Sequence, residues 1–195
     1  MGDKANEGRE QGGSAIGADA LFRAHATFVA AFVTRLGATK AEVDDLVQEV
    51  FIVAHTKGGY QPGPAQPRTW LAAIALRVTR ARQRSSARRR EDPSSSAFDS
   101  MTAAGKDPGE ALEVAESLGR VQRALDTLDI EHRAAFILYE IEGESCQEIA
   151  AALEVPVGTI YSRLHTARRR FLDAHEGDGR GSSHAPRARR AAEGV

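Results

Sequence analysis

Apolar residues recur at intervals of three and four along most of this chain, which is the spacing of one face of an α-helix. The chain lacks the sustained alternation of apolar and polar residues that is typical of strands. The sequence therefore predicts an all-α protein. The first stripe ends at Gly37, a residue typical of the position just after a helix. Its members are Phe22, His25, Ala26, Val29, Phe32, Val33 and Leu36.

Two further helices are predicted in the first half. Thr39 and Glu42 have the spacing of a capping box, in which the two residues satisfy each other's free backbone amides. The buried stripe that follows comprises Val43, Leu46, Val47, Val50 and Ala54. It leaves Asp44, Asp45, Gln48, Glu49 and Ile52 largely on other faces. After a loop over residues 58–67 that is rich in glycine and proline, a third helix is expected from about Thr69.

The second half predicts four helices, over residues 110–128, 130–142, 145–153 and 157–174. Ser145 can cap the short third one, and Pro156 suits the first turn of the last one. A short helix, a tight turn and a longer helix form the pattern of a helix-turn-helix. The buried side of the last helix is predicted to comprise Ile160, Leu164, Ala167 and Phe171.

Three polar segments flank and separate these helical blocks. Residues 1–17 and 176–195 lack periodicity, and we expect both to be disordered, the second as a basic tail. Residues 91–109 are acidic and contain proline, glycine and serine, a composition that cannot form a packed core. The fold prediction is two small helical domains, 18–90 and 110–175, joined by a flexible acidic linker.

Composition excludes several classes of protein. The chain has 195 residues, and its longest apolar run, Trp70 to Leu76, is far shorter than a membrane span of about 20 residues. No signal peptide is recognisable, so we expect a cytoplasmic protein. A single cysteine, Cys146, and six histidines without ligand spacing indicate no metal or redox site. We expect no cofactor and no enzymatic activity, with Cys146 on a partly exposed helix and Trp70 in the core.

Charge is divided sharply between neighbouring segments. Residues 68–90 contain eight arginines and no acid, whereas residues 91–116 contain seven acids and one lysine. Arg77, Arg80 and Arg84 share one helix face, where they can neutralise phosphates. In the last helix, the residues that point away from the buried side are Tyr161, Ser162, His165, Thr166 and Arg169. Three further arginines of this helix can reach flanking phosphates: Arg163, Arg168 and Arg170. These patterns favour DNA binding over an ordinary solvated surface.

Several motifs occur together in the order typical of one protein family. Residues 44–51 read Asp-Asp-Leu-Val-Gln-Glu-Val-Phe, and residues 68–71 read Arg-Thr-Trp-Leu. The helix-turn-helix carries Glu148-Ile149-Ala150 and, at its turn, Val155-Pro156-Val157-Gly158-Thr159-Ile160. From about Ala20 to Phe171 the sequence resembles the bacterial extracytoplasmic-function (ECF) sigma factors of RNA polymerase.

The resemblance implies that residues 18–90 are sigma region 2, which docks on polymerase and melts the minus-ten element, and that residues 110–175 are region 4, which reads the minus-thirty-five element. The implied partners are promoter DNA, an anti-sigma factor and core RNA polymerase, through the clamp of its beta-prime subunit and the flap of its beta subunit. The implied polymerase-binding residues are Asp44, Asp45, Gln48, Glu49 and Phe51. The implied DNA-binding residues are Arg68, Trp70, Arg77, Arg80, Arg84, Thr159, Tyr161, Ser162, Arg163, His165, Thr166, Arg168 and Arg169.

Two positions depart from the family pattern. The family commonly has Asn at the position of Arg77 and frequently a basic residue at that of Tyr161, so promoter preference is expected to differ. Two other functions stay open at this point. A helix-turn-helix regulator that binds an operator without polymerase would share the last two helices but would lack residues 44–51. An enzyme would need convergent ionisable groups that the sequence does not assemble.

The predicted linker adds a mechanical expectation. Nineteen residues span at most roughly 63 to 68 Å when extended but average only about 22 to 26 Å as a flexible coil. Two promoter elements two helical turns apart, roughly 70 Å, would require the linker to be stretched, and polymerase binding could supply the stretch. The free protein should therefore hold its two domains close together and bind promoters poorly alone.

Overall fold

The computed structural model describes residues 15–90 and 108–181, and within them every element except one isolated bridge is helical. The first part of the chain forms α1 (Ala18–Arg35), α2 (Lys40–Thr56) and α3 (Pro67–Arg90). The second part forms α4 (Pro108–Asp126), α5 (Ile130–Phe136), the π-helical turn η1 (Ile137–Ile141), α6 (Cys146–Leu153) and α7 (Val157–Gly181). The predicted all-α class is confirmed.

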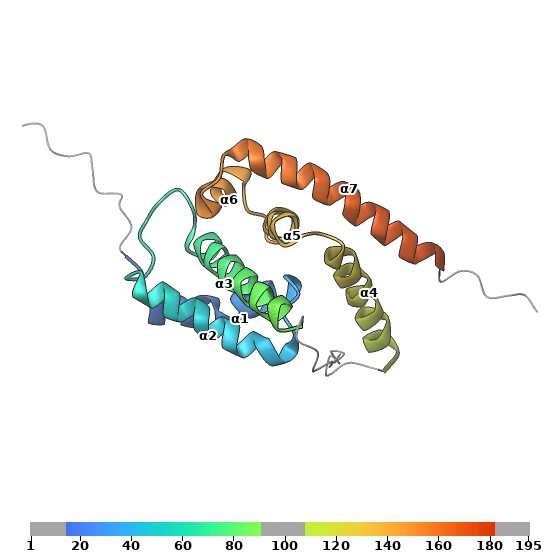
Figure 1. Cartoon of the computed structure of the whole chain (residues 1–195), viewed down its shortest axis with the longest axis horizontal. Helices are drawn as coiled ribbons and strands as arrows, with labels where there is room; N and C mark the ends of the chain where they lie inside the picture. Colours follow the sequence, from blue (N-terminus) through green and yellow to red (C-terminus); the bar gives the residue numbers. More distant parts are fainter. Residues whose placement is uncertain (1–14, 91–107, 182–195) are drawn as a thin grey trace, which may run out of the picture.

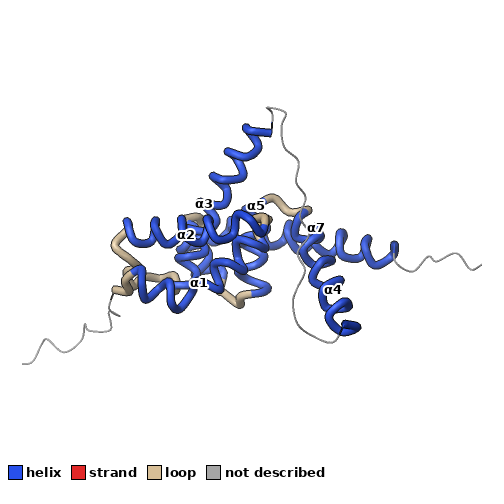
Figure 2. The backbone as a smooth tube through the Cα atoms, turned by 90° about the horizontal axis from the view of Figure 1, so that it is seen from below, coloured by secondary structure: helices blue, strands red, loops and turns tan. Residues whose placement is uncertain are grey.

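Helix α3 lies at the centre of the molecule, between α1 and α2 on one side and α5 and α6 on the other (Figure 1). The three helices of the first part pack pairwise, and in the second part α7 packs against α4, α5 and α6. Buried side chains of both parts belong to one continuous cluster, which includes Phe32, Leu46, Leu71, Leu125, Ile149 and Ile160. The last turns of α3 project beyond the bundle (Figure 2).

Local signals fix several helix ends. Gly37 follows α1 with φ +98°, and its N–H donates to the carbonyl oxygen of Thr34 at 2.9 Å. Glycine suits this left-handed conformation because it has no Cβ. At the start of α2 the carboxylate of Glu42 accepts hydrogen bonds from the backbone N–H of Thr39 at 3.0 Å and from its hydroxyl at 2.7 Å. The predicted capping box is therefore present.

The helix expected over residues 130–142 changes its winding halfway. After α5 the backbone N–H of Glu142 donates to the carbonyl oxygen of Ile137 at 3.0 Å, five residues earlier, which is the wider spacing of a π-helix. The spacing of apolar residues at three and four does not reveal such a turn, because the turn lies at the end of the predicted helix, where no further apolar positions follow to show the change of period. Glu140 lies within this turn, and Glu142 follows at its C-terminal end.

Several positions differ from the sequence predictions. Phe22 is 48% exposed because Leu21 takes the buried place on α1. Cys146 is buried in the core instead of lying partly exposed. Ile16, in the segment predicted to be disordered, exchanges two backbone hydrogen bonds of 2.9 Å with Tyr60. Helix α4 starts inside the predicted linker, and α7 continues to Gly181, inside the predicted disordered tail.

The rest of those three predicted segments, residues 1–14, 91–107 and 182–195, lies outside the described residues. Within the two described ranges, no helix is both long enough and apolar enough to cross a lipid bilayer.

Candidate functional site

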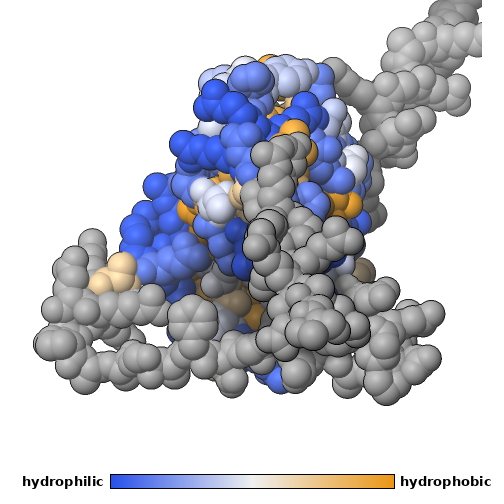
Figure 3. Space-filling view, turned by 90° about the vertical axis from the view of Figure 1, so that its right-hand side faces the viewer, coloured by the Kyte–Doolittle hydropathy of each residue, from blue (hydrophilic) through white to orange (hydrophobic). Residues whose placement is uncertain are grey.

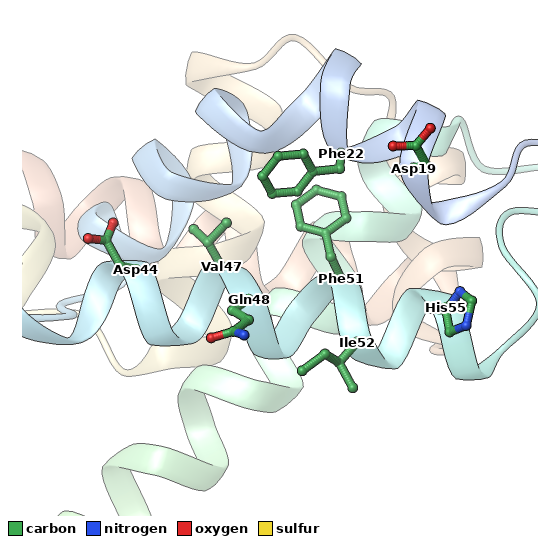
Figure 4. Close-up of a pocket in the computed structure, with 8 residues that line it drawn as sticks. All are labelled: Asp19, Phe22, Asp44, Val47, Gln48, Phe51, Ile52 and His55. Carbon is green, nitrogen blue, oxygen red and sulfur yellow. The ribbon is translucent and has the colours of Figure 1, made fainter.

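An open groove with a volume of about 610 Å³ runs between α1 and α2 (Figure 4). Its apolar floor includes Phe22 and Phe51, whose rings meet edge to face with centroids 5.0 Å apart. Ile52 is 54% exposed beside them. The other lining residues are Asp19, Asp44, Val47, Gln48 and His55. An apolar floor between carboxylates suits a partner that presents apolar side chains with basic neighbours.

The residues implied to bind polymerase lie on this groove or next to it. Asp44, Asp45, Gln48 and Glu49 are exposed, as their positions outside the buried stripe predicted. Phe51 is buried at the groove floor and offers a partner little of its surface.

Sequence reasoning missed the two apolar residues with the largest exposed surface at the groove. It placed Phe22 in the core and gave Ile52 no role. The available signal was an isoleucine outside the buried stripe, four residues after Gln48.

The basic face of α3 is already engaged by carboxylates of the second part of the chain. Arg77 Nη2 lies 2.9 Å from Glu154 Oε1, and Arg80 Nη1 lies 2.5 Å from Glu131 Oε1. Arg84 is exposed, and no ion pair joins it to another residue within the described ranges. Sequence reasoning placed these three arginines on one face but gave no sign that acids of the same chain would meet two of them.

Glu142 forms the most enclosed of these contacts. Its carboxylate pairs with Arg35, with Nη1 and Oε1 2.8 Å apart, and with Arg68, and its side chain is only 8% exposed. The guanidinium of Arg68 also lies over the ring of Phe28, 4.4 Å from the centroid. Burial, and then the charge of Arg68, hold the pKa of nearby His25 below its ordinary value. Arg68, predicted to bind DNA, is therefore occupied within the protein.

Trp70, also predicted to contact DNA, is half-buried against Tyr60. Their ring centroids are 5.8 Å apart in an edge arrangement, and the hydroxyl of Tyr60 donates to the carbonyl oxygen of Ala65 at 2.7 Å. Trp70 packs against the core and holds the loop before α3 in place, which agrees with the core position that its pattern predicts.

The helix-turn-helix has the predicted geometry. Ser145 caps α6 by accepting a hydrogen bond from the backbone N–H of Glu148 at 3.2 Å, and Glu154 makes the turn with φ +58°. The Ser145 hydroxyl in turn donates to the Glu148 carboxylate, and together with the Ser145 N–H it lowers the pKa of that group. Ile160, Leu164 and Ala167 are buried as predicted, and Phe171 is partly buried against them.

The opposite face of α7 is open. Tyr161 is 54% exposed, Ser162, His165 and Arg169 are exposed, and Thr159, Arg163 and Thr166 are partly so. The Ser162 hydroxyl donates a hydrogen bond to the carbonyl oxygen of Thr159 at 3.0 Å. The predicted recognition residues therefore lie together at the start of α7.

The arginines of α7 divide into two groups. Arg168 Nε lies 2.5 Å from Glu140 Oε1, its guanidinium lies over the ring of Tyr139, and the hydrogen bond to Glu140 raises its pKa. Arg170 lies 3.8 Å from Asp129. Arg163 and Arg169 have no ion pair within the described part of the chain, so their charges are the ones available to phosphates.

Arg133 is a buried arginine that sequence reasoning missed. It binds Asp126 at 2.9 Å and the carbonyl oxygen of Leu128 at 3.1 Å, and burial lowers its pKa although Asp126 opposes the shift. It ties the end of α4 to α5.

Among the residues described, no group of three or more histidine, cysteine, aspartate or glutamate side chains could hold a metal ion.

Comparisons with known proteins place both parts of the chain. The family model "Sigma-70 region 2" matches residues 21–89, which cover α1 to α3, and "Sigma-70, region 4" matches residues 118–171, which fall within α4 to α7. The ECF RNA polymerase sigma factor SigE of Mycolicibacterium smegmatis is 35% identical over 156 residues, 80% of this chain and 60% of that protein. The ECF RNA polymerase sigma-E factor of Escherichia coli K12 is 33% identical over 150 residues, 72% of this chain and 76% of that protein.

Solved structures share the fold. The sigma factor RpoE from Bartonella quintana, in complex with the anti-sigma factor NepR, superposes with a TM-score of 0.62 at 25% identity, over 80% of this chain and 95% of that one. CnrH, in complex with the cytosolic domain of CnrY, gives a TM-score of 0.53 at 25% identity, over 83% and 88%. With both sigma regions matched in order and a relative aligned over most of its length, the chain belongs to the ECF RNA polymerase sigma factors.

Proposed function

We propose that this chain binds core RNA polymerase and directs it to promoters by contacting the minus-ten and minus-thirty-five elements. The observation that supports this function is the presence of region 2 and region 4 in one chain, each with an exposed surface of suitable chemistry. The family is not enzymatic, so the role is to place the polymerase.

In this proposal the groove between α1 and α2 receives the clamp of the beta-prime subunit. Phe22 and Ile52 supply exposed apolar area, and Asp44, Asp45 and Glu49 around them favour a basic partner. The buried ring of Phe51 supports Phe22 from below.

A second contact is proposed for the flap of the beta subunit. The end of the molecule that carries α4 and α7 is mostly hydrophilic with small apolar patches (Figure 3). Leu118 of α4 and Leu172 of α7 are 60% and 55% exposed. These leucines give region 4 the apolar surface that a docking contact needs.

For the minus-thirty-five element, we assign base contacts to the first turns of α7, the part of a recognition helix that enters the major groove. Tyr161, Ser162 and His165 face outward there, and Thr159 and Thr166 flank them. Arg163 and Arg169 reach phosphates, with Arg168 as a weaker contributor because of its partner Glu140.

For the minus-ten element, the phosphate contacts are assigned to Arg77, Arg80 and Arg84, which requires Arg77 and Arg80 to exchange the carboxylates of Glu154 and Glu131 for phosphates. Arg68, at the start of the same helix, would likewise have to leave Glu142. Trp70 acts here by positioning the loop before α3, because little of its ring is free to stack on a base.

Two further properties follow from the family. The RpoE and CnrH structures are both described as complexes, the first with an anti-sigma factor, and we propose that an anti-sigma factor also controls this chain. A sigma factor acts where the polymerase is, so we place the protein in the cytoplasm, on the nucleoid when bound to polymerase.

Run-off transcription with purified core polymerase and a promoter library tests the function. Transcripts should start at defined sites only when this chain is added. A gel shift should show promoter binding with core enzyme and much weaker binding without it, whereas strong binding without polymerase would indicate an operator-binding regulator instead.

A matched pair of variants tests the groove. Ile52→Asp should weaken binding to core polymerase at least about tenfold, because it replaces exposed apolar surface by a charge. Thr27→Asp, which adds the same charge at an exposed position of α1 outside the groove, should bind as the unmodified protein does. Equal losses in both variants would show that the groove is not the docking surface.

A further inference from the structure

The segment in front of α1 is joined to the loop in front of α3. The backbone N–H of Ile16 donates to the carbonyl oxygen of Tyr60, and the N–H of Tyr60 donates to the carbonyl oxygen of Ile16, both at 2.9 Å. This pair forms an isolated antiparallel bridge between segments that α1 and α2 separate along the chain. The Ile16 side chain is partly buried against the core. The bridge therefore holds the first residues of the loop to a segment that is itself anchored.

Gly59 allows the two segments to approach this closely. Its φ is +83°, and a Cβ added there would clash with the carbonyl oxygen of Ile16. This oxygen belongs to the backbone and cannot turn aside as a flexible side chain can, so any larger residue at position 59 must displace Ile16. Gly58 has a similar φ of +77°, but a Cβ there would meet no atom of the described residues within 4 Å. The two glycines share one backbone requirement, and only Gly59 is also required for the bridge.

A second set of contacts holds the end of the loop nearest α3. Tyr60 is 7% exposed, and its hydroxyl donates to the carbonyl oxygen of Ala65 at 2.7 Å. Its ring meets that of Trp70 edge to face. Between these contacts, residues 61–64 are exposed and uncharged, and two prolines among them restrict the backbone. The loop is therefore fixed at both ends and stiff between them.

We propose that Ile16 is a positioning residue for recognition of the minus-ten element, acting through its bridge to Tyr60 on the loop before α3. The loop leads into Arg68 and Trp70, at the start of the helix to which the proposed function assigns that element. A loop that is already ordered loses little conformational entropy when DNA binds beside it, whereas a released loop has to be ordered at the expense of affinity. The inference rests on the proposed function for the identity of the ligand, and not for the fixing of the loop.

Tryptophan fluorescence of the full chain tests whether the bridge fixes the loop. Trp70 is the single tryptophan of the sequence, so its emission reports on the contact with Tyr60. Gly59→Ala should shift the emission to longer wavelength, because displacement of Ile16 releases Tyr60 and admits water to the indole ring. The matched control Gly58→Ala carries the same backbone strain without the clash and should emit as the unmodified protein does. Equal emission from the two variants would overturn the proposal.

Binding of separate promoter elements by the holoenzyme, assembled from core polymerase and this chain, tests the positioning role. Gly59→Ala should bind a single-stranded oligonucleotide that carries the minus-ten element about tenfold more weakly than Gly58→Ala does, because its loop must be ordered on binding. The two variants should bind a minus-thirty-five duplex equally, since α7 is unchanged. Equal affinities for the minus-ten oligonucleotide, or an equal loss for both elements, would overturn the proposal.

The salt dependence gives a readout that separates positioning from lost phosphate contacts. Neither substitution removes a charge, so the slope of log affinity against log salt concentration for the minus-ten oligonucleotide should be the same in both variants. A shallower slope in Gly59→Ala would show that phosphate contacts of α3 are lost instead, and would overturn the proposed role of the loop.

A second pair of variants addresses the bridge without changing a glycine. Ile16→Pro removes the N–H that donates to Tyr60, whereas Ala15→Pro places the same ring at an exposed residue whose N–H has no backbone partner within the described part of the chain. Helix content measured by circular dichroism should be unchanged in both. Ile16→Pro should repeat the loss of minus-ten affinity, and an equal affinity in Ala15→Pro would overturn the proposal.

Together the measurements distinguish this inference from the proposed function. A shifted emission in Gly59→Ala, with no promoter binding by any of the assembled holoenzymes, would refute the proposed function and leave the fixing of the loop by Ile16 standing. Normal run-off transcription and normal minus-ten affinity in Gly59→Ala would refute the positioning role alone.

Discussion

Ile160 and Tyr161 are neighbours on α7 whose replacement by alanine should have opposite consequences. The Ile160 side chain is 0% exposed and packs in the core shared with Ile149 and Leu164, so truncation leaves a cavity. The loss of three buried carbons at such a site destabilises by about 2 to 5 kcal/mol, and we expect about 3 kcal/mol here. Promoter preference should not change in the molecules that stay folded.

Tyr161→Ala removes a side chain that is 54% exposed and has no hydrogen bond in the structure to another described residue. Stability should therefore change by less than about 0.5 kcal/mol, as for most surface substitutions. Sequence preference should change, because a side chain that contacts a base edge contributes roughly 1 to 3 kcal/mol of discrimination.

Urea unfolding followed by far-ultraviolet circular dichroism measures the first effect, and competition between promoters altered in the minus-thirty-five element measures the second. The m-value should be the same in both variants, so that midpoints compare directly. The reasoning is refuted if Tyr161→Ala lowers stability as much as Ile160→Ala does, or if it leaves the preference for the minus-thirty-five sequence unchanged.

Three further substitutions have outcomes that the geometry fixes. Gly37→Ala should lower the free energy of unfolding by about 1 kcal/mol or more, because φ at Gly37 is +98° and the new Cβ would lie 2.9 Å from a guanidinium nitrogen of Arg133. Unchanged thermal stability would contradict this prediction. Hydrogen bonds from Ser145 lower the pKa of Glu148, so the contribution of the Glu148 carboxylate to folding stability is complete above the ordinary carboxyl pKa and is lost as the pH falls through the lowered pKa. In denaturant unfolding, Glu148→Gln should therefore be less stable than the unmodified protein by about 0.5 to 1 kcal/mol at neutral pH, and this difference should shrink in acid. A difference that grew in acid would argue against the cap. The slope of log affinity against log salt concentration for promoter binding should become shallower by about 1 in Arg163→Ala and by less in Arg168→Ala, because Arg168 is paired with Glu140. The reverse order would show that Arg168 leaves Glu140 when DNA binds.

The helix boundaries and the inner face of α7 were predictable because their causes are local. Gly37, the pair Thr39 and Glu42, and Ser145 each act within four residues of the helix end that they define. The burial of Ile160 and Leu164 follows from their spacing alone. These capping and spacing signals can be read without knowing which helices pack against one another.

The exposure of Phe22 was not predictable, because Leu21 and Phe22 both lie at the edge of one apolar stripe and only the position of α2 decides between them. The pairing of Arg35 with Glu142 joins residues 107 positions apart, and no periodicity carries that information. The same holds for Cys146, which is expected on a partly exposed helix and which the contact of α6 with the core buries.

The arginine tract shows most clearly where sequence reasoning stops. Arg77 and Arg80 were placed on one face, and a basic face suits phosphates, but a guanidinium binds a carboxylate with the same geometry. The choice between the two depends on the distance between the halves of the molecule. The sequence therefore specifies these arginines without specifying which acidic groups they meet in the folded chain.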